Sequence, residues 1–323
     1  MVFDVPILFV VFNRPATTRL VFEQIRRLKP KHLYIAADGP RFDRPSDQPN
    51  CAEVREICND IDWECNAKRL YRTTNLGCKV AVSSAIDWFF SQVDEGIILE
   101  DDVLPDPTFF AFCKDMLEKY RYDEKVMHIS GFNILGTWKA ARQSWHFSYF
   151  GTIWGWATWK RSWSKYDVSI GKWNEVAVQE HILKTYFPES VRANRKALYD
   201  ELYAGKIDTW DYQWTFCRLL EGGYSIIPSV NLVTNIGFDQ HATHTSVAPS
   251  WLPKKLESLR TPYKAPGKVA VDREFDDLHL KSTIFGAGRS GGFRSGLQKL
   301  KSALKKYVLF ILDGKNETTH GIS

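Results

Sequence analysis

Residues 96–110, GIILEDDVLPDPTFF, join an apolar run to three consecutive acids and a proline-broken turn. The uninterrupted run predicts a strand that is buried on both faces, as in a parallel sheet. Adjacent carboxylates repel one another, and here Glu100, Asp101 and Asp102 follow directly on the strand. Two interpretations are open for them: they cap the next helix, or a cation binds among them.

Strands and helices alternate through the first 130 residues. Residues 5–12, VPILFVVF, are a second continuous apolar run, and the helical spacing of apolar residues over 15–28 follows a proline that helices tolerate at their start. Further strands are predicted at 31–38, 67–73, 95–100 and 125–132, and further helices at 51–60, 78–93 and 108–121. This alternation predicts an α/β fold with a mostly parallel sheet flanked by helices.

The strand rhythm is lost after residue 135. Helices are predicted at 157–166, 189–204 and 210–221, and short strands at 224–227 and 231–236. Residues 262–293 are rich in Gly, Lys and Arg and are predicted to be irregular. A last amphipathic helix is predicted at 295–312, before a frayed end.

Composition excludes several classes of protein. Of the 323 residues, 44% are hydrophobic and 25% charged, which is ordinary for a soluble globular chain. The apolar runs are too short to span a bilayer, and Asp4 interrupts the stretch where a signal peptide would be apolar. The six cysteines show neither a CxxC pair nor zinc-ligand spacing, which favours reduced thiols and a cytoplasmic location.

The net charge of +5 is concentrated near the C-terminus, where six Lys or Arg and no acid lie between residues 288 and 306. Without that stretch the chain is close to neutral, which argues against a nucleic-acid binder. The predicted helix 295–312 either docks on its own domain or lies on an anionic membrane surface, such as the inner face of the cell membrane.

Polar residues follow the predicted strands at one edge of the sheet. Asn13 and Arg14 follow the first strand, Asp38 the second, and the acid triplet (residues 100–102) the fourth. Ligands of open α/β sheets bind beyond the carboxyl ends of the strands. Carboxylates opposite an arginine suit Mg²⁺ or Mn²⁺ holding a diphosphate, so the cation interpretation is favoured over capping.

Five segments together resemble the GT-A nucleotide-sugar glycosyltransferases, in particular the N-acetylglucosaminyltransferase I type and its bacterial relatives. They are PILFVVFNRPATT, YIAADGPR, YRTTNLGCKVA, IILEDDVLPDPTFF and TWDYQWTFCRLLEGGYSIIPSVNLVTNIG. These segments lie within 5–110 and 208–240, in the family's order. The resemblance implies a GT-A fold and a UDP-sugar donor, with UDP-GlcNAc as the preferred donor.

The resemblance also implies roles for single residues. Asp102 would be the ligand of Mn²⁺ or Mg²⁺, with Asp101 facing the ribose and Glu100 facing the donor sugar. Arg14 would meet the diphosphate and Asp38 the base. The nucleotide-sugar site after the first two strands then comprises Phe12, Asn13, Arg14 and Asp38.

Two departures limit the resemblance. We expect no N-terminal membrane anchor of the kind that the Golgi enzymes carry, and residues 135–200 do not align, so the choice of acceptor does not carry over.

We expect one GT-A domain with a nucleotide-sugar-binding half at 1–135. An aromatic-rich half at 136–261 would supply the acceptor side and the catalytic base, and a basic tail with the terminal helix would follow at 262–323.

The NLGCK stretch has two readings. Asn75 and Gly77 can form a plain turn from strand to helix. The glycine also allows a close approach of backbone to a nucleotide, and Lys79 at the helix start can reach a phosphate.

Asp211, in DTWDYQW, is the predicted general base, because it matches the family's catalytic aspartate and a carboxylate can take the acceptor proton. Asp208 is its competitor, since either residue can instead cap the helix that begins there. Flanking Trp210 and Trp214 would exclude water and raise the aspartate's pKa, which favours Asp211.

Two further sets of residues are assigned to the cleft. His244, with His241 in the loop NIGFDQHATHT, is either a plain surface histidine or a cation beside the diphosphate. Trp154 and Trp156 flank Gly155 in a predicted turn and would stack on sugar rings. Two other tryptophans, at helical spacing, are predicted to fill the core: Trp159 and Trp163.

The sequence therefore predicts a metal-dependent, inverting glycosyltransferase that moves a sugar, with GlcNAc preferred, from a UDP-sugar to a hydroxyl of a glycan or lipid-linked acceptor. A non-catalytic nucleotide-sugar-binding module would keep Asp38 without needing Asp211. A sugar-nucleotide pyrophosphorylase would need a glycine-rich loop after the first strand, and residues 10–18, VVFNRPATT, contain no glycine.

Overall fold

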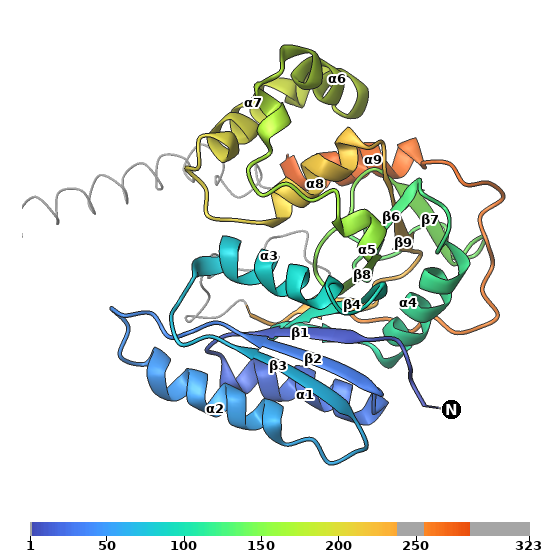
Figure 1. Cartoon of the computed structure of the whole chain (residues 1–323). Helices are drawn as coiled ribbons and strands as arrows, with labels where there is room; N and C mark the ends of the chain where they lie inside the picture. Colours follow the sequence, from blue (N-terminus) through green and yellow to red (C-terminus); the bar gives the residue numbers. More distant parts are fainter. Residues whose placement is uncertain (1, 238–254, 285–323) are drawn as a thin grey trace, which may run out of the picture.

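A computed structural model describes residues 2–237 and 255–284 (Figure 1). Within these residues, the main sheet has eight strands in the order β3-β2-β1-β4-β8-β6-β9-β7. A second, two-stranded antiparallel sheet pairs β10 with β5. The strands are β1 (Ile7–Val11), β2 (His32–Ala37), β3 (Asn66–Tyr71), β4 (Glu95–Glu100), β5 (Val103–Pro105), β6 (Val126–Ser130), β7 (Trp145–Ser148), β8 (Trp156–Trp159), β9 (Tyr224–Pro228) and β10 (Val233–Asn235).

The first four strands of the main sheet are parallel, in the order 3-2-1-4 of a doubly wound α/β fold. β8 then runs antiparallel between β4 and β6, β9 pairs with β6 in parallel, and β7 closes the far edge antiparallel to β9. The predicted α/β class, a mostly parallel sheet flanked by helices, is confirmed.

Helices cover both faces of the sheet because successive strand residues point to opposite faces. On β1, Ile7 and Phe9 belong to a core with α1, α2 and α4, whereas Leu8 belongs to a core with α3 and α8. Figure 1 shows α1 and α2 on one face and α3 on the other. The helices are α1 (Pro15–Leu28), α2 (Asp47–Asn59), α3 (Gly77–Phe90), α4 (Pro107–Lys119), α5 (Lys160–Trp163), the 3₁₀ turn η1 (Gly171–Asn174), α6 (Val176–Tyr186), α7 (Glu189–Tyr203), α8 (Asp211–Leu220) and α9 (Arg273–Ile284).

Local sequence explains where several helices begin and end. Pro15 is the first residue of α1, and Arg26 and Arg27 occupy its last turn, near the negative end of the helix dipole. The carboxylate of Asp106 accepts from Thr108 N at 2.8 Å and so caps α4. Capping by the acids at 100–102 is therefore not needed for this helix.

The second half of the chain differs from the prediction. The helix predicted at 157–166 is wrong in part, because residues 156–159 form β8 and only the single helical turn α5 lies within the predicted range. β8 pairs with β4 along its whole length and with β6 through Trp156 and Ala157, and this pairing overrides the helical spacing of its tryptophans. The irregular stretch predicted at 262–293 is also wrong in part, because α9 lies within it.

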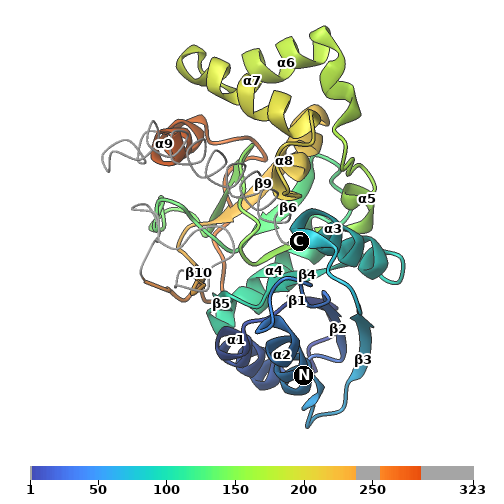
Figure 2. The same cartoon turned by 90° about the vertical axis from the view of Figure 1, so that its left-hand side faces the viewer.

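Four further elements had no counterpart in the prediction: the short strand β5, the edge strand β7, the 3₁₀ turn η1 and the helix α6. α6 and α7 stand together at one end of the molecule, away from the strands β1–β3 (Figures 1 and 2). The predicted helix 295–312 lies outside the described residues, so its membrane contact stays a prediction. No helix in the described ranges combines the length and apolarity that a bilayer crossing requires.

Candidate functional site

The acid triplet lies beside Arg14 at the carboxyl ends of β4 and β1. Glu100 is the last residue of β4 and pairs with Val10 of β1, so the residues that follow each strand meet at one edge. Arg14 Nη1 lies 2.5 Å from Asp102 Oδ2 and 3.9 Å from Asp101 Oδ1. The backbone N–H of Phe12 donates to Asp101 at 2.9 Å. The structure thus brings together the residues predicted on both strands.

Negative charge at this edge exceeds positive charge. Burial, and then Asp102 and Asp101, raise the pKa of Glu100 well above its usual value, and Asp211 adds to the shift. Burial and Asp102 also raise the pKa of Asp101. Oε1 of Glu100 is buried and has no hydrogen-bond partner among the described residues. Perturbed carboxylates of this kind cluster at functional sites, because folding alone does not favour them.

The carboxylates suit a divalent cation that a substrate helps to bind. The described ranges contain no group of three or more His, Cys, Asp or Glu side chains arranged to hold a metal. Mg²⁺ commonly takes only one or two carboxylates and completes its shell with water and substrate phosphates. The orphaned oxygen of Glu100 and the clustered charge of Asp101 and Asp102 fit such a shared site.

Asp38 anchors the turn that contains Asn75. Its carboxylate accepts from Asn75 Nδ2 at 2.9 Å and from Leu76 N at 3.0 Å, and only 8% of the residue is exposed. Gly77 begins α3 with φ of +77°, a conformation that glycine adopts without strain. The structure shows a turn from strand to helix at Asn75 and Gly77. The contacts of Asp38, Asn75, Gly77 and Lys79 with a nucleotide stay predictions.

Asn13 and Phe12 have partners from the loop that follows β2. Asn13 Nδ2 donates to Asp47 at 2.7 Å, and the guanidinium of Arg41 lies 5.3 Å from the centre of the Phe12 ring. Arg41 also donates to the buried carboxylate of Asp47 through Nε at 2.6 Å. These contacts hold the loop against the end of β1, next to Arg14.

Asp208 and Asp211 have different partners. Asp208 Oδ1 accepts from Lys79 N at 3.3 Å, so it caps α3 and not its own helix. Asp211 begins α8, where the hydroxyl of Thr209 donates to its carboxylate and its charge raises the pKa of Glu100. The residue at the N-cap of α8 is Trp210, with no side-chain cap. The N-cap residue of α8 is thus neither Asp208 nor Asp211, and the role of Asp211 as general base stays a prediction.

Trp156 does not line a cleft. Its side chain is 0% exposed, and its ring stacks on His128 at 5.1 Å and on Trp210 at 5.8 Å between ring centres. A ring enclosed in this way cannot meet a sugar, so its assignment to the donor site is wrong. Trp159 and Trp163 are buried, as predicted. His244 lies outside the described residues, and its role stays a prediction.

Three contributors at the site were missed from the sequence. Cys78, in the first turn of α3, has a pKa raised to about 12 by burial and then by Glu100, Asp208 and Asp211, which places it among these carboxylates. Thr209 could have been found from its place in DTWD, beside the predicted base. Gly237 left no signal: a Cβ there would lie 2.3 Å from Asp102 Oδ2, a contact that only the folded chain reveals.

No protein-family model and no curated protein matches the chain. Structures of similar shape include mouse xyloside xylosyltransferase 1 in its apo form, at 8% identity and a TM-score of 0.33, covering 67% of this chain and 81% of that one. A cytidylyltransferase from Leptospira borgpetersenii serovar Hardjo-bovis (strain JB197) has 10% identity and a TM-score of 0.33, covering 60% and 73%. A UDP-glucose pyrophosphorylase complexed with UDP-glucose has 8% identity and a TM-score of 0.35, covering 72% and 93%. Similarity at this level assigns no activity to this chain.

Proposed function

We propose that this chain is a metal-dependent glycosyltransferase that moves a sugar from a nucleoside diphosphate sugar to an acceptor hydroxyl. The observation that carries the proposal is the meeting of Arg14 and the acid triplet with Asp211, which comes from a helix more than a hundred residues later. Transfer from such a donor needs positive charge against the leaving diphosphate and a carboxylate to take the acceptor proton.

The residues of the chain divide these tasks. Asp102 would hold the divalent cation together with the substrate's phosphates, with Glu100 facing the donor sugar, and the cation would supply charge that stabilises the leaving diphosphate. The planar guanidinium of Arg14, with five N–H donors, suits a phosphate as well as the carboxylate of Asp102. Asp211 would accept the proton of the acceptor hydroxyl, and Thr209 holds its carboxylate in place.

Single displacement by an activated hydroxyl inverts the configuration of the anomeric carbon, so we propose an inverting reaction. UDP-GlcNAc as the donor and a glycan or lipid-linked glycan as the acceptor rest on the resemblance of the sequence motifs. A cytoplasmic location, with the segment 295–312 at the inner face of the membrane, is the corresponding proposal for the cell.

A sugar-nucleotide pyrophosphorylase is the second candidate, because it uses the same kind of sheet. The link from β1 to α1 argues against it: the link lacks the glycines of a phosphate-binding loop, and α1 begins at Pro15, which has no backbone N–H to offer a phosphate. A pyrophosphorylase also has no step that requires an acceptor-side base such as Asp211.

A panel of sugar nucleotides, each with and without Mn²⁺, tests the proposal by thermal stabilisation. A donor present at about 100 times its Kd stabilises the folded state by about 2.7 kcal/mol. We expect stabilisation by a UDP-sugar that depends on Mn²⁺, and UDP release when glycan acceptors are added. Conversion of the nucleotide sugar and labelled pyrophosphate into labelled nucleoside triphosphate and sugar 1-phosphate would instead identify a pyrophosphorylase.

A further inference from the structure

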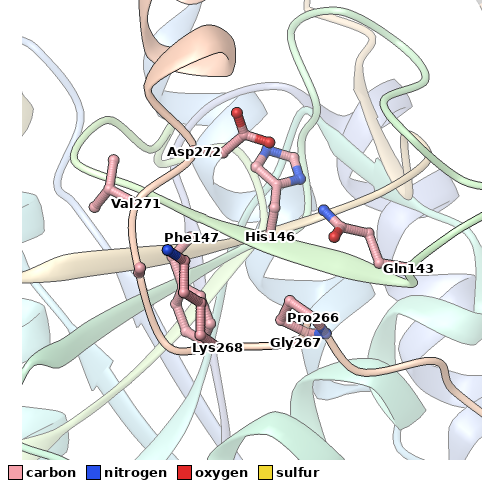
Figure 3. Close-up of a pocket in the computed structure, with 9 residues that line it drawn as sticks. Gln143, His146, Phe147, Pro266, Gly267, Lys268, Val271 and Asp272 are labelled. Atoms are coloured by element: carbon pink, nitrogen blue, oxygen red, sulfur yellow. The ribbon is translucent and has the colours of Figure 1, made fainter.

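A pocket of about 490 Å³ lies at the β7 edge of the main sheet, away from the acid triplet (Figure 3). The segment 264–272 runs beside β7 and is attached at two points. Ser144 N donates to Lys264 O, and Asp272 N donates to Phe147 O, each at 2.8 Å. Between these points the segment has more residues than β7, so it bulges outward and leaves the pocket. Its volume lies within the range of about 300–1,000 Å³ that is usual for small-molecule sites.

His146 is the polar group of the pocket that folding leaves unsatisfied. The residue is 1% exposed, and neither Nδ1 nor Nε2 has a partner among the described residues. Its ring packs on Phe275, with ring centres 4.1 Å apart. A buried polar group without a hydrogen bond costs about 1–3 kcal/mol, and such groups in native structures call for an explanation. A hydrogen bond between the imidazole and a ligand hydroxyl would explain why neither nitrogen has a partner.

The pocket carries little unbalanced charge beyond one exposed lysine, Lys268, at its wall. Burial lowers the pKa of His146 to about 3, so the ring is neutral. The carboxylate of Asp272 is 2.8 Å from Lys139 Nζ and 3.0 Å from Trp138 Nε1. A ligand that relies on a strong net charge therefore finds no match among these groups.

The remaining wall suits a hydroxyl-rich ring. Figure 3 shows the imidazole between the side chains of Asp272 and Gln143. An imidazole and an amide each donate and accept hydrogen bonds, as a sugar hydroxyl does. The half-buried Pro266 adds apolar surface for the C–H groups of such a ring.

The N-terminal half of β7, which lines the pocket, lies at the same end of the sheet as the acid triplet. Trp145 and His146 of β7 pair with Pro228 and Ile227, the last residues of β9, and β9 runs in the same direction as β4. Four strand-to-strand steps separate β7 from β4. At about 4.8 Å a step, the two sites lie roughly 19 Å apart along the edge.

We propose that this pocket binds a neutral saccharide residue, a distal unit of the glycan that accepts the transferred sugar. The acceptor assignment rests on the proposed function, whereas saccharide binding does not. A glycan chain several residues long spans the distance, so the pocket selects acceptors by length.

Saturation-transfer NMR on the full chain tests saccharide binding with the methyl glycosides of glucose, galactose, mannose and N-acetylglucosamine. His146→Phe keeps a ring against Phe275 and removes both nitrogens, and Gln143→Ala removes the amide. Tyr122→Ala is the control, because this exposed aromatic lies outside the pocket. We expect at least one glycoside to bind, and its affinity to fall at least fivefold in both pocket variants but not in the control.

Absence of glycoside binding, or equal binding by the pocket variants, overturns the proposal. So does binding of inorganic phosphate that His146→Phe abolishes, because the site would then hold an anion. Circular dichroism checks that His146→Phe folds. If it does not fold, the half-buried Gln143 carries the test alone.

An activity measurement separates this proposal from the proposed function. Gln143→Ala should raise KM for a long glycan acceptor at least fivefold and leave kcat and the KM of a short acceptor unchanged. If glycoside binding requires His146 and Gln143 but the unaltered chain has no transferase activity, the saccharide pocket would stand and the proposed function would be rejected. If the chain binds no glycoside, and neither variant affects transfer to acceptors of any length, the proposed function would stand and the saccharide pocket would be rejected.

Discussion

The strand ends on the two sides of β8 differ in charge. Beyond β1 and β4, Arg14 faces Asp101 and Asp102, and burial leaves their charges close together. On β6 and β7, burial lowers the pKa of His128 and of His146, so these polar groups stay neutral. One sheet edge therefore offers a charged region and a neutral region. The first suits a cation with a diphosphate, and the second suits an uncharged acceptor.

The difference teaches where folding tolerates unfavourable electrostatics. Oε1 of Glu100 is buried without a partner beside two further acids, an arrangement that opposes folding. On the neutral side the aromatic rings of Trp156, Trp210 and Trp214 fill the space around His128 instead. Asp211 follows Trp210 and begins the helix that carries Trp214, and so links the two regions.

Asp211→Asn should have the largest effect, because in the proposed reaction this carboxylate takes the acceptor proton in the chemical step. Loss of a general base lowers rates by about 10²–10⁴, so transfer should fall at least about a hundredfold. Affinity for the UDP-sugar and Mn²⁺ should stay within a few-fold. Steady-state kinetics and calorimetry measure the two quantities, and NMR should show inverted anomeric configuration in the product of the unaltered chain.

The matched control is Asp208→Asn, since Asp208 caps α3 through Lys79 N. Cap loss lowers stability by about 0.5–2 kcal/mol and should leave turnover near normal. If the Asp211→Asn variant keeps its activity and the Asp208→Asn variant loses it, Asp211 is not the general base.

Asp102→Asn should abolish metal-dependent nucleotide binding. The change removes a charge and almost no volume, so circular dichroism should show an intact fold. We expect the affinity for UDP with Mn²⁺ to fall at least about tenfold, or about 1.4 kcal/mol. Unchanged Mn²⁺ dependence would show that the charged region is not a metal site.

Gly237→Ala should weaken the same binding indirectly. The new Cβ would stand 2.3 Å from Asp102 Oδ2 and 2.9 Å from Arg14 Nη1, so the ion pair must shift. We expect a loss of UDP affinity with Mn²⁺ of several-fold, measured by calorimetry. Gly267→Ala is the control, because a Cβ there has no neighbour within 4 Å. Equal behaviour of the two variants would contradict the close approach.

Asp276 gives the smallest effect and tests the neutral side. Burial raises its pKa to about 7, while the hydroxyl of Ser148 donates to it. Below pH 3.8 the carboxyl is protonated in both states; as pH rises toward 7, the unfolded chain loses the proton first and stability falls. The slope is at most about 1.4 kcal/mol per pH unit. Urea denaturation of Asp276→Asn should show a flatter profile between pH 4 and 7.

Strand ends could be predicted from the sequence because continuous apolar runs mark them without knowledge of the fold. The positions of Arg14, Asp38 and the acid triplet follow from strand order, since parallel strands end at one edge. β8 could not be predicted in this way. Its tryptophans recur at a spacing that also suits a helix, and only the gap between β4 and β6 makes residues 156–159 a strand.

The site was less predictable wherever a contact depends on distant segments. Nothing in DTWDYQW distinguishes Asp208, which reaches α3, from Asp211, which stays with Thr209. Trp156 was placed in the cleft because rings beside a glycine are hard to bury in a turn. The fold buries it by surrounding it with His128 and Trp210, from β6 and the start of α8.

β8 has a mechanical consequence. It is hydrogen-bonded to β4 on one side and to β6 on the other. The strands that carry the charged region and those that carry the neutral region therefore form one continuous sheet. Enzymes that close two lobes on a substrate need a linker between the lobes about which they can rotate. Here rotation would break the ladder on either side of β8. The distance between the charged and neutral regions is thus fixed when the chain folds. Under the proposed function, that fixed distance would select substrates by their length.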